Sequence, residues 1–179
     1  MRYNKTIALS SRGGIINSLM PKIIDIKLSK LLKVKLINLE LKGKDKKQVI
    51  AELVELIVQS GKLKNKKAFF KTIINREKLG STGIGQGVAI PHGKSNFVKG
   101  FVLVFARKKE GIDFGALDGE KTFLFFALAS PEEEVGGHLK ILAMVSRLVK
   151  DKFTIDLLKK ETDKAKILKI VAAAEGRFN

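Results

Sequence analysis

Residues 101–129 read FVLVFARKKEGIDFGALDGEKTFLFFALA, and this stretch decides the fold that we expect. Two continuous apolar runs of strand length, Phe101 to Ala106 and Phe123 to Ala129, enclose the turn pair Asp118-Gly119. Strands that are apolar on both faces belong to a sheet that is covered on both sides. The stretch therefore predicts a sheet that lies between two layers of helices.

The flanking segments supply the helices and the remaining strands. Upstream, Leu36 to Leu41 alternates like a strand, Asp45 can cap a helix through Ser60, and Asn65 can cap a second helix. Val88 to Ile90 predicts a short strand, and three helices are expected at about 137–149, 152–159 and 163–174. The expected order is β-α-α-β-β-β-α-α-α, in an α/β fold on a mixed sheet.

Composition sets limits on the class of protein. The 179 residues suit one domain, expected at 27–179, after a basic N-terminal extension at 1–26. Because there is no cysteine, the chain has no disulfide, no thiolate catalysis and no Cys-based metal site. No apolar run is long enough to span a membrane, and the first residues do not resemble a secretory signal. We expect a cytoplasmic protein.

The net charge of +17 raises the question of nucleic acid as a partner. Lysine supplies most of the 35 basic side chains, and they are scattered along the chain. Base readout and phosphate forks favour arginine, and no recognised nucleic-acid motif is present. A lysine-rich solvated surface is the simpler interpretation, and nonspecific polyanion binding at low salt stays open.

The segment richest in chemistry runs from Arg76 to Lys94, REKLGSTGIGQGVAIPHGK. Its dense glycines permit positive φ and could bring backbone N–H groups together, a geometry that cradles anions. The spacing fits neither a P-loop nor the dinucleotide-binding fingerprint. We expect a strand to deliver Pro91 and His92 to a loop at the sheet edge, where Gly93 removes a side chain beside the histidine.

The chain has only two histidines, His92 and His138. A histidine is more often structural than catalytic, but His92 lies in a glycine-flanked segment and His138 lies in the first turn of a predicted helix. Neutral imidazole is a competent nucleophile near pH 7, so His92 is the candidate to take up a phosphoryl group. Arg76 could bind the equatorial oxygens of this phosphoryl group, and His138 could donate a hydrogen bond to the same oxygens.

Weaker candidates for phosphate binding lie nearby. The backbone at Gly93 could supply N–H groups, and Ser81 and Thr82 could add hydroxyls, although capping the turn is an alternative role for these two side chains. Glu132-Glu133-Glu134, just before His138, is the one acidic cluster. It is either a solvated loop or a local docking patch for a basic partner.

The run from Arg76 to Lys94 closely resembles the active-site segment of the enzyme IIA domains of the bacterial phosphoenolpyruvate:sugar phosphotransferase system. The match is to the fructose/mannitol class (type 2), which includes the nitrogen-regulatory type. It extends over about residues 28–175 and includes Ile112-Asp113-Phe114, Leu117-Asp118-Gly119 and His138-Leu139.

The resemblance implies a three-layer α/β/α sandwich that carries a phosphohistidine intermediate, without metal or other cofactor. It makes His92 the residue that is phosphorylated by the phosphocarrier HPr or its nitrogen-branch paralogue. His138 and Arg76 match the second histidine and the arginine of the family's active site. The phosphoryl group would then pass to a IIB domain, or its presence would regulate a kinase or transporter protein.

Three functions stay open at this point. The chain is a phosphotransferase that feeds a sugar permease, or a regulatory protein of the nitrogen type, and the sequence alone does not separate these two. A noncatalytic nucleic-acid-binding or scaffold protein on the same fold is the third, and the presence of His92, His138 and Arg76 argues against it.

Overall fold

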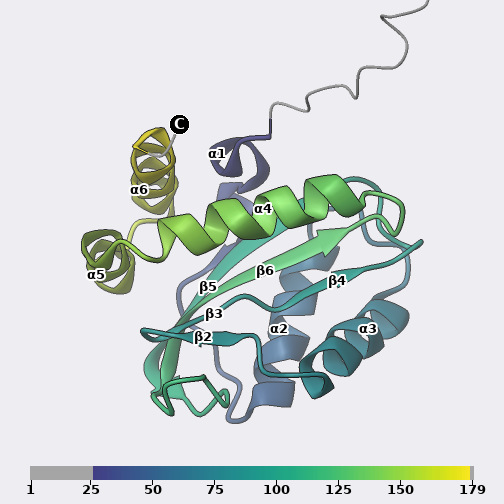
Figure 1. The fold of residues 1–179 in the computed structure, drawn as a ribbon, viewed down its shortest axis with the longest axis horizontal. Helices are drawn as coiled ribbons and strands as arrows, with labels where there is room; N and C mark the ends of the chain where they lie inside the picture. Colours follow the sequence, from purple (N-terminus) through teal and green to yellow (C-terminus); the bar gives the residue numbers. More distant parts are fainter. Residues whose placement is uncertain (1–25, 178–179) are drawn as a thin grey trace, which may run out of the picture.

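The computed structural model describes residues 26–177, and a mixed six-stranded sheet runs through this part of the chain (Figure 1). The two long strands, β5 (Val102–Ile112) and β6 (Thr122–Ser130), pair antiparallel at its centre. The short strands are β1 (Ile37–Asn38), β2 (Gly83–Gly85), β3 (Val88–Ala89) and β4 (His92–Lys94). The mixed sheet that the two apolar runs predict is therefore present.

The strand order is β1-β5-β6-β3-β2, and β4 also pairs with β6. Strands β3 and β4 both run parallel to β6, one after the other along the same side of it. Strand β3 pairs with β6 near Leu124, whereas β4 pairs His92 with Leu128 and Lys94 with Ser130. The chain thus carries His92 to the end of β6 from which the next helix starts.

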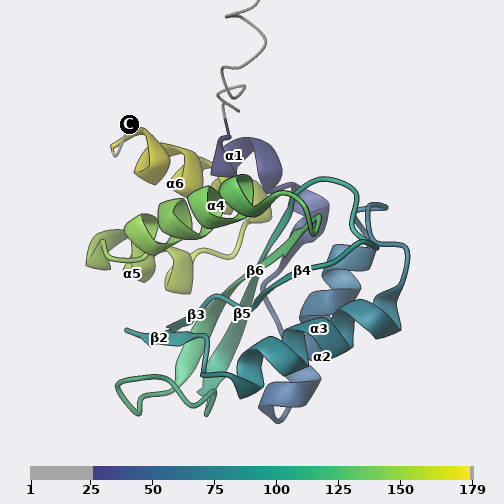
Figure 2. The same cartoon turned by 45° about the vertical axis from the view of Figure 1, so that its right-hand side comes forward.

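Helices α2 (Lys46–Val58) and α3 (Lys66–Lys78) cover one face of the sheet (Figure 2). Each begins with a side-chain cap, because Asp45 accepts a hydrogen bond from the backbone N–H of Gln48 and Asn65 accepts one from Ala68. Their buried apolar side chains pack against alternate residues of β5 and β6.

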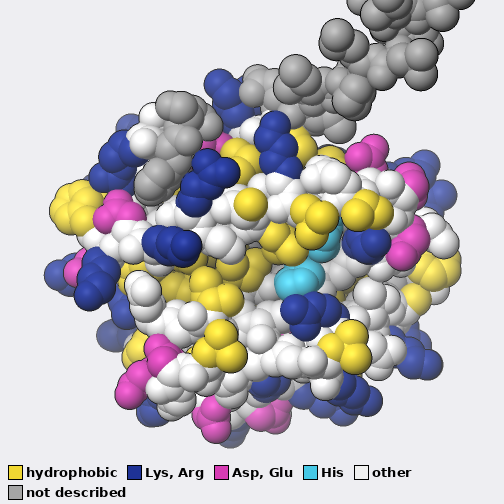
Figure 3. Space-filling model, viewed as in Figure 1, with side chains coloured by type: hydrophobic (Ala, Val, Ile, Leu, Met, Phe, Trp, Pro, Cys, Tyr) yellow, Lys and Arg dark blue, Asp and Glu magenta, His cyan; other side chains and the backbone are white. Residues whose placement is uncertain are grey.

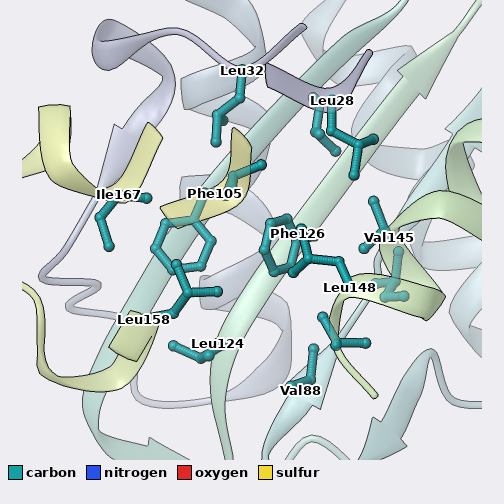
Figure 4. Packing of buried hydrophobic residues seen from close by; sticks show 14 of the residues in the cluster. Leu28, Leu32, Val88, Phe105, Leu124, Phe126, Val145, Leu148, Leu158 and Ile167 are labelled. Atoms are coloured by element: carbon teal, nitrogen blue, oxygen red, sulfur yellow. The ribbon is translucent and has the colours of Figure 1, made fainter. Parts of the chain in front are cut away.

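The other face is covered by α4 (Val135–Leu148), α5 (Lys152–Lys160), α6 (Lys164–Gly176) and the short α1 (Leu28–Leu31). A 3-10 turn, η2 (Val34–Leu36), follows α1. The rings of Phe105 and Phe126, from neighbouring strands, lie 5.0 Å apart at the centre of this core (Figure 4). Residues 102–106 of β5 and nearly all of β6 are buried on both faces, and for this reason their runs are apolar without alternation.

The buried carboxylate of Glu175, near the end of α6, holds the start of α1. It accepts hydrogen bonds from the backbone N–H groups of Leu28 and Ser29 and from the Ser29 hydroxyl. The two backbone N–H groups are donors that a helix leaves unpaired at its N-terminus. Glu175, which lies near the other end of the sequence, therefore caps α1.

The observed elements differ from the expected ones in several places. Strands β2 and β4 are additional, and the run from Leu36 to Leu41 contributes only the two strand residues of β1. The extension expected at 1–26 lies outside the described residues except for Ile26, which is buried in the core beside α1. Within residues 26–177, no helix has the length and apolar character needed to cross a membrane.

Candidate functional site

The ring of His92 is held in one tautomer by its own strand. Its Nδ1 lies 2.7 Å from the carbonyl oxygen of Ile90, and a carbonyl can only accept, so Nδ1 carries the proton. The remaining nitrogen, Nε2, therefore has the free lone pair. Nε of Arg76 donates a hydrogen bond to this lone pair at 3.1 Å. The nitrogen that could act as a nucleophile is thus defined, and it is Nε2.

Arg76 reaches His92 from the last turn of α3. Phe69 and Ile73 are buried on the same side of this helix as Arg76, in the preceding turns, and they pack against the sheet so that the last turn directs Arg76 toward β4. A second bond, from Nη1 of Arg76 to the carbonyl oxygen of Gly80 at 3.0 Å, orients the guanidinium. Arg76 and His92 are both half-buried, so the pair stays accessible from outside.

His138 lies in the first turn of α4, and its ring centroid is 5.5 Å from that of His92 (Figure 3). The ring planes are tilted by 59°. The Nδ1 atom of His138 lies 2.9 Å from the hydroxyl oxygen of the fully buried Ser130, the last residue of β6. The three residues predicted to act together, Arg76, His92 and His138, are therefore neighbours in space.

Both histidines favour their neutral forms. Burial lowers the pKa of His92, and Arg76 lowers it further, although the bond to Ile90 and the charge of Glu77 oppose this. Burial lowers the pKa of His138 to about 4, with help from His92 and Lys94. At pH 7 His92 is therefore an uncharged imidazole with its lone pair available.

Glu77 anchors the turn that follows Arg76, a role that the sequence analysis missed. Its buried carboxylate accepts bonds from the backbone N–H of Thr82, from the Thr82 hydroxyl at 2.6 Å and from Nζ of Lys46 at 3.0 Å. Burial alone would raise the pKa of Glu77, but the bonds from Thr82 and Lys46 outweigh it and lower the pKa. The turn that presents the Gly80 carbonyl to Arg76 is thus tied to α2 and α3.

The hydroxyls of Ser81 and Thr82 are already engaged within this turn. Ser81 donates to the carbonyl oxygen of Phe114 at 3.0 Å and accepts from the N–H of Gly83, while Thr82 bonds to Glu77. These contacts match the alternative role of capping the turn. Phosphate binding by Ser81, Thr82 and Gly93 stays a prediction.

The glycine-dense segment forms a β-hairpin. The anion-cradling turn that was expected there is therefore wrong. Strands β2 and β3 pair antiparallel, and the tip residues Gln86 and Gly87 have φ of 55° and 76°. The N–H of Gln86 donates to the carboxylate of Asp118 at 2.8 Å. The glycines serve this tight turn, and the anion bound at its tip is a side chain of the protein itself.

His92 and Gly93 also lie differently from expectation. His92 belongs to strand β4 and not to a loop. Gly93 is buried against α3, where a Cβ atom would lie 3.0 Å from Cγ2 of Thr72. The absence of a side chain at Gly93 therefore lets β4 pack closely on α3.

The helix start near His138 is likewise more engaged than expected. Helix α4 begins at Val135, so His138 is its fourth residue, and the backbone N–H of His138 already donates to the carbonyl oxygen of Glu134. Gly137 packs tightly on the ring of Phe101. The side chain of His138, rather than its backbone, is what this turn offers to a phosphoryl group.

Exposed apolar side chains surround the histidines (Figure 3). Leu79 follows Arg76 at the end of α3, and Val135 and Leu139 flank His138 on α4. Leu79 is 86% exposed and Leu139 is 59% exposed. A site with a half-buried nucleophile and an apolar rim is suited to reaction with a group that another protein presents.

Comparison with known proteins finds relatives along most of this chain. Residues 30–174 match the family described as phosphoenolpyruvate-dependent sugar phosphotransferase system, EIIA 2. A nitrogen regulatory protein of Bradyrhizobium diazoefficiens is 38% identical over 133 residues, 74% of this chain and 86% of that protein. The fructose-specific EIIABC component of Bacillus subtilis is 37% identical over 141 residues, 78% of this chain, but the match spans only 22% of that longer protein.

A solved structure shows the same fold. The nitrogen regulatory protein IIA-Ntr of Neisseria meningitidis superposes with a TM-score of 0.75 at 32% identity, and the match covers 80% of this chain and 97% of that protein. The α/β architecture with helices around a mixed sheet is therefore shared with proteins of this type.

Proposed function

Because the chain belongs to the EIIA 2 family of the phosphoenolpyruvate-dependent sugar phosphotransferase system, we propose that it carries a phosphoryl group on Nε2 of His92. The observation that supports this most is the tautomer of His92. Its Nδ1 proton is directed to the carbonyl of Ile90, so the lone pair of Nε2 is available to attack phosphorus.

The chemistry needs no proton transfer. Nε2 of His92 bonds to phosphorus as the bond to the donor's imidazole nitrogen breaks, and that electron pair returns to the donor ring. The positive charge that His92 gains is stabilised by the bond from Nδ1–H to Ile90. Because the transition state is loose, the remaining task is to hold the oxygens, and Arg76 has the donors and the position for it.

The proposed donor is HPr or its nitrogen-branch paralogue, each of which carries a phosphohistidine. The proposed acceptor is a IIB domain, and the alternative outcome is regulation of a kinase or transporter by the phosphorylated state. We keep both the transport role and the regulatory role, because one relative is named a nitrogen regulatory protein and another a fructose-specific EIIABC component. A cytoplasmic location follows from these partners as part of the proposal.

Transfer of radiolabelled phosphate in vitro tests the proposal. Phosphoenolpyruvate, enzyme I and a carrier should label this chain with an adduct that is labile in acid and stable in base. A His92→Ala variant with an unchanged far-UV circular dichroism spectrum should take no label, whereas His138→Ala should take it slowly. Label on the His92→Ala variant at the rate of the parent chain would refute the proposal.

The second step separates transport from regulation. A strain that lacks the protein should lose uptake of a sugar if the acceptor is a IIB domain. Unchanged uptake of every sugar tested, together with phosphorylation-dependent capture of a kinase or transporter subunit, would favour the regulatory role.

A further inference from the structure

Ser130 lies at the junction between the sheet and the second histidine. It is the last residue of β6, it is fully buried, and its Oγ is 2.9 Å from Nδ1 of His138. Nothing in the sequence alone pointed to a role for this serine. Among the described residues, no other hydrogen-bond partner of this hydroxyl is present.

The fold fixes Ser130 tightly. Strand β4 pairs Lys94 with Ser130, and the backbone N–H of Ser95 donates to the Ser130 carbonyl at 3.0 Å. Leu124 and Leu128, at even positions along β6, pack in the core on the α4 side, and Ser130 continues this alternation. Helix α4 starts five residues later and brings His138 back over the strand end.

Hydrogen-bond satisfaction selects one of two arrangements for this pair. If Nδ1 of His138 carried the proton, it would donate to Ser130, and the buried hydroxyl proton of Ser130 would have no acceptor among the described residues. If the Ser130 hydroxyl donates to an unprotonated Nδ1, both groups are satisfied. A buried donor without a partner is destabilising, so the second arrangement is favoured.

We propose that Ser130 is a positioning residue whose hydroxyl donates to Nδ1 of His138 and so keeps the His138 proton on Nε2, where it can bond a phosphoryl oxygen on His92. This rests on the proposed function, since the phosphoryl group is the ligand of the His138 N–H. The two histidines then have opposite tautomers. His92 exposes a lone pair at Nε2 for attack, and His138 exposes an N–H for charge stabilisation.

The protonation state of His138 supports this assignment. Burial, together with His92 and Lys94, lowers the pKa of His138 to about 4, so the ring carries a single proton on nitrogen at neutral pH. That proton lies either on Nδ1 or on Nε2. A ring in the other tautomer would present a lone pair to a phosphoryl oxygen, which repels it. The identity of the group bonded to Nδ1 therefore controls whether His138 helps or hinders transfer.

A series at position 130 tests the proposal. Ser130→Thr keeps the hydroxyl donor, Ser130→Ala removes it, and Ser130→Asp offers only acceptors, which would force the proton onto Nδ1. We expect transfer from a phosphorylated carrier to fall in the order parent chain, Thr, Ala, Asp, with Thr within about twofold of the parent and Asp at least about 100-fold slower. Ser95→Ala is the matched control, because Ser95 is also a buried serine at this sheet edge and its hydroxyl contacts only the N–H of Phe97.

A second readout does not depend on phosphoryl transfer. Long-range ¹H–¹⁵N spectra at pH 7 report which ring nitrogen of His138 is protonated, and the parent chain should show Nε2 protonated and Nδ1 bare. Ser130→Asp should reverse this pattern. If Ser130→Asp does not fold, Ser130→Ala still tests the proposal. Loss of the hydrogen bond from Ser130 should change the ¹⁵N chemical shift of Nδ1 of His138.

Several results would overturn the assignment. Protonated Nδ1 in the parent chain would do so, and so would a Ser130→Ala variant that matches the parent in both transfer rate and His138 ring shifts. A loss of thermal stability without any change in ring shifts would reduce Ser130 to a packing residue. Failure of the proposed function looks different, since His92 would take no label from any carrier while the His138 tautomer stayed as assigned.

Discussion

Nε of Arg76 lies 3.1 Å from Nε2 of His92, so the guanidinium donates to the very lone pair that must attack phosphorus. The bond holds the ring of His92 in place. In the proposed reaction this bond would give way to phosphorus, and the same N–H would then bond a phosphoryl oxygen, so that Arg76 changes its partner as the transfer proceeds.

The first prediction concerns the fork of donors on Arg76. Arg76→Lys keeps the charge but cannot bond His92 and the Gly80 carbonyl together, so we expect transfer to slow by about 100-fold with the fold intact. Quench-flow labelling from a phosphorylated carrier measures the rate. Lys78→Ala, an exposed charge two residues further along α3, is the control and should be near the parent rate. Arg76→Lys at the rate of the parent chain would contradict the prediction and show that the charge alone, rather than the fork of donors, is what Arg76 supplies.

The pH dependence of transfer follows from the protonation of His92. Attack requires the neutral ring, and burial together with Arg76 lowers the pKa of His92 below 6.5. The rate should therefore begin to decline at a lower pH than it would for a histidine with the ordinary pKa. In Arg76→Ala the pKa of His92 should rise, and the decline should begin at higher pH. An NMR titration of the His92 ring that gives a pKa at or above 6.5 in the parent chain would contradict this.

His138 should make the fold sensitive to moderate acid. Its pKa is about 4 when folded and about 6.5 when unfolded, so the unfolded chain binds the extra proton between these values. The stabilisation is complete above pH 6.5 and is lost as the pH falls toward 4, by about 3 kcal/mol at most. Urea unfolding of the parent and of His138→Gln across this range isolates the effect. Parallel pH curves for the two proteins would show that His138 contributes nothing.

The carboxylate of Glu77 should matter for stability as well as for activity. Glu77→Ala leaves the buried N–H and hydroxyl of Thr82 without an acceptor, and we expect a loss of about 3 kcal/mol in the free energy of unfolding. Lys46→Met removes a half-buried partner and should cost less, about 1 kcal/mol. Chemical denaturation gives both values, and the opposite ranking would mean that the ion pair, rather than Thr82, is what Glu77 serves.

The acidic residues ahead of α4 provide a test of docking. Glu132 and Glu133 are exposed in the loop that leads to His138. If a basic carrier docks there, Glu132→Gln with Glu133→Gln should slow association and weaken its dependence on salt. Glu120→Gln, an exposed acid at the turn before β6, is the control. If the association rate and its salt dependence are unchanged, the loop is a solvated surface loop and not a docking patch.

Local chemistry in the sequence was enough to predict the capped helices. Asp45 and Asn65 cap α2 and α3 through bonds to residues three positions away, which the sequence itself displays. The two core strands were equally predictable, because burial on both faces leaves a continuous apolar run. Arg76, His92 and His138 were found from residue type and the family resemblance, and their proximity is a result of the fold.

The errors come from features that only tertiary contacts decide. Strand β4, His92 to Lys94, has no apolar pattern and forms a strand only by pairing with β6. Glycines with positive φ serve a hairpin tip and an anion cradle equally well, and the Asp118 carboxylate that distinguishes them lies 32 residues away. Glu77 and Ser130 were missed for the same reason, because nothing in a single sequence says which buried polar groups will meet.

The capping of α1 by Glu175 joins the beginning and the end of residues 26–177. The first and last described helices pack together, so both ends of residues 26–177 emerge at one rim of the molecule (Figure 1). The histidine pair lies on the broad face between α4 and α3, away from this rim. The two ends of residues 26–177 therefore leave the face that carries the histidine pair uncovered.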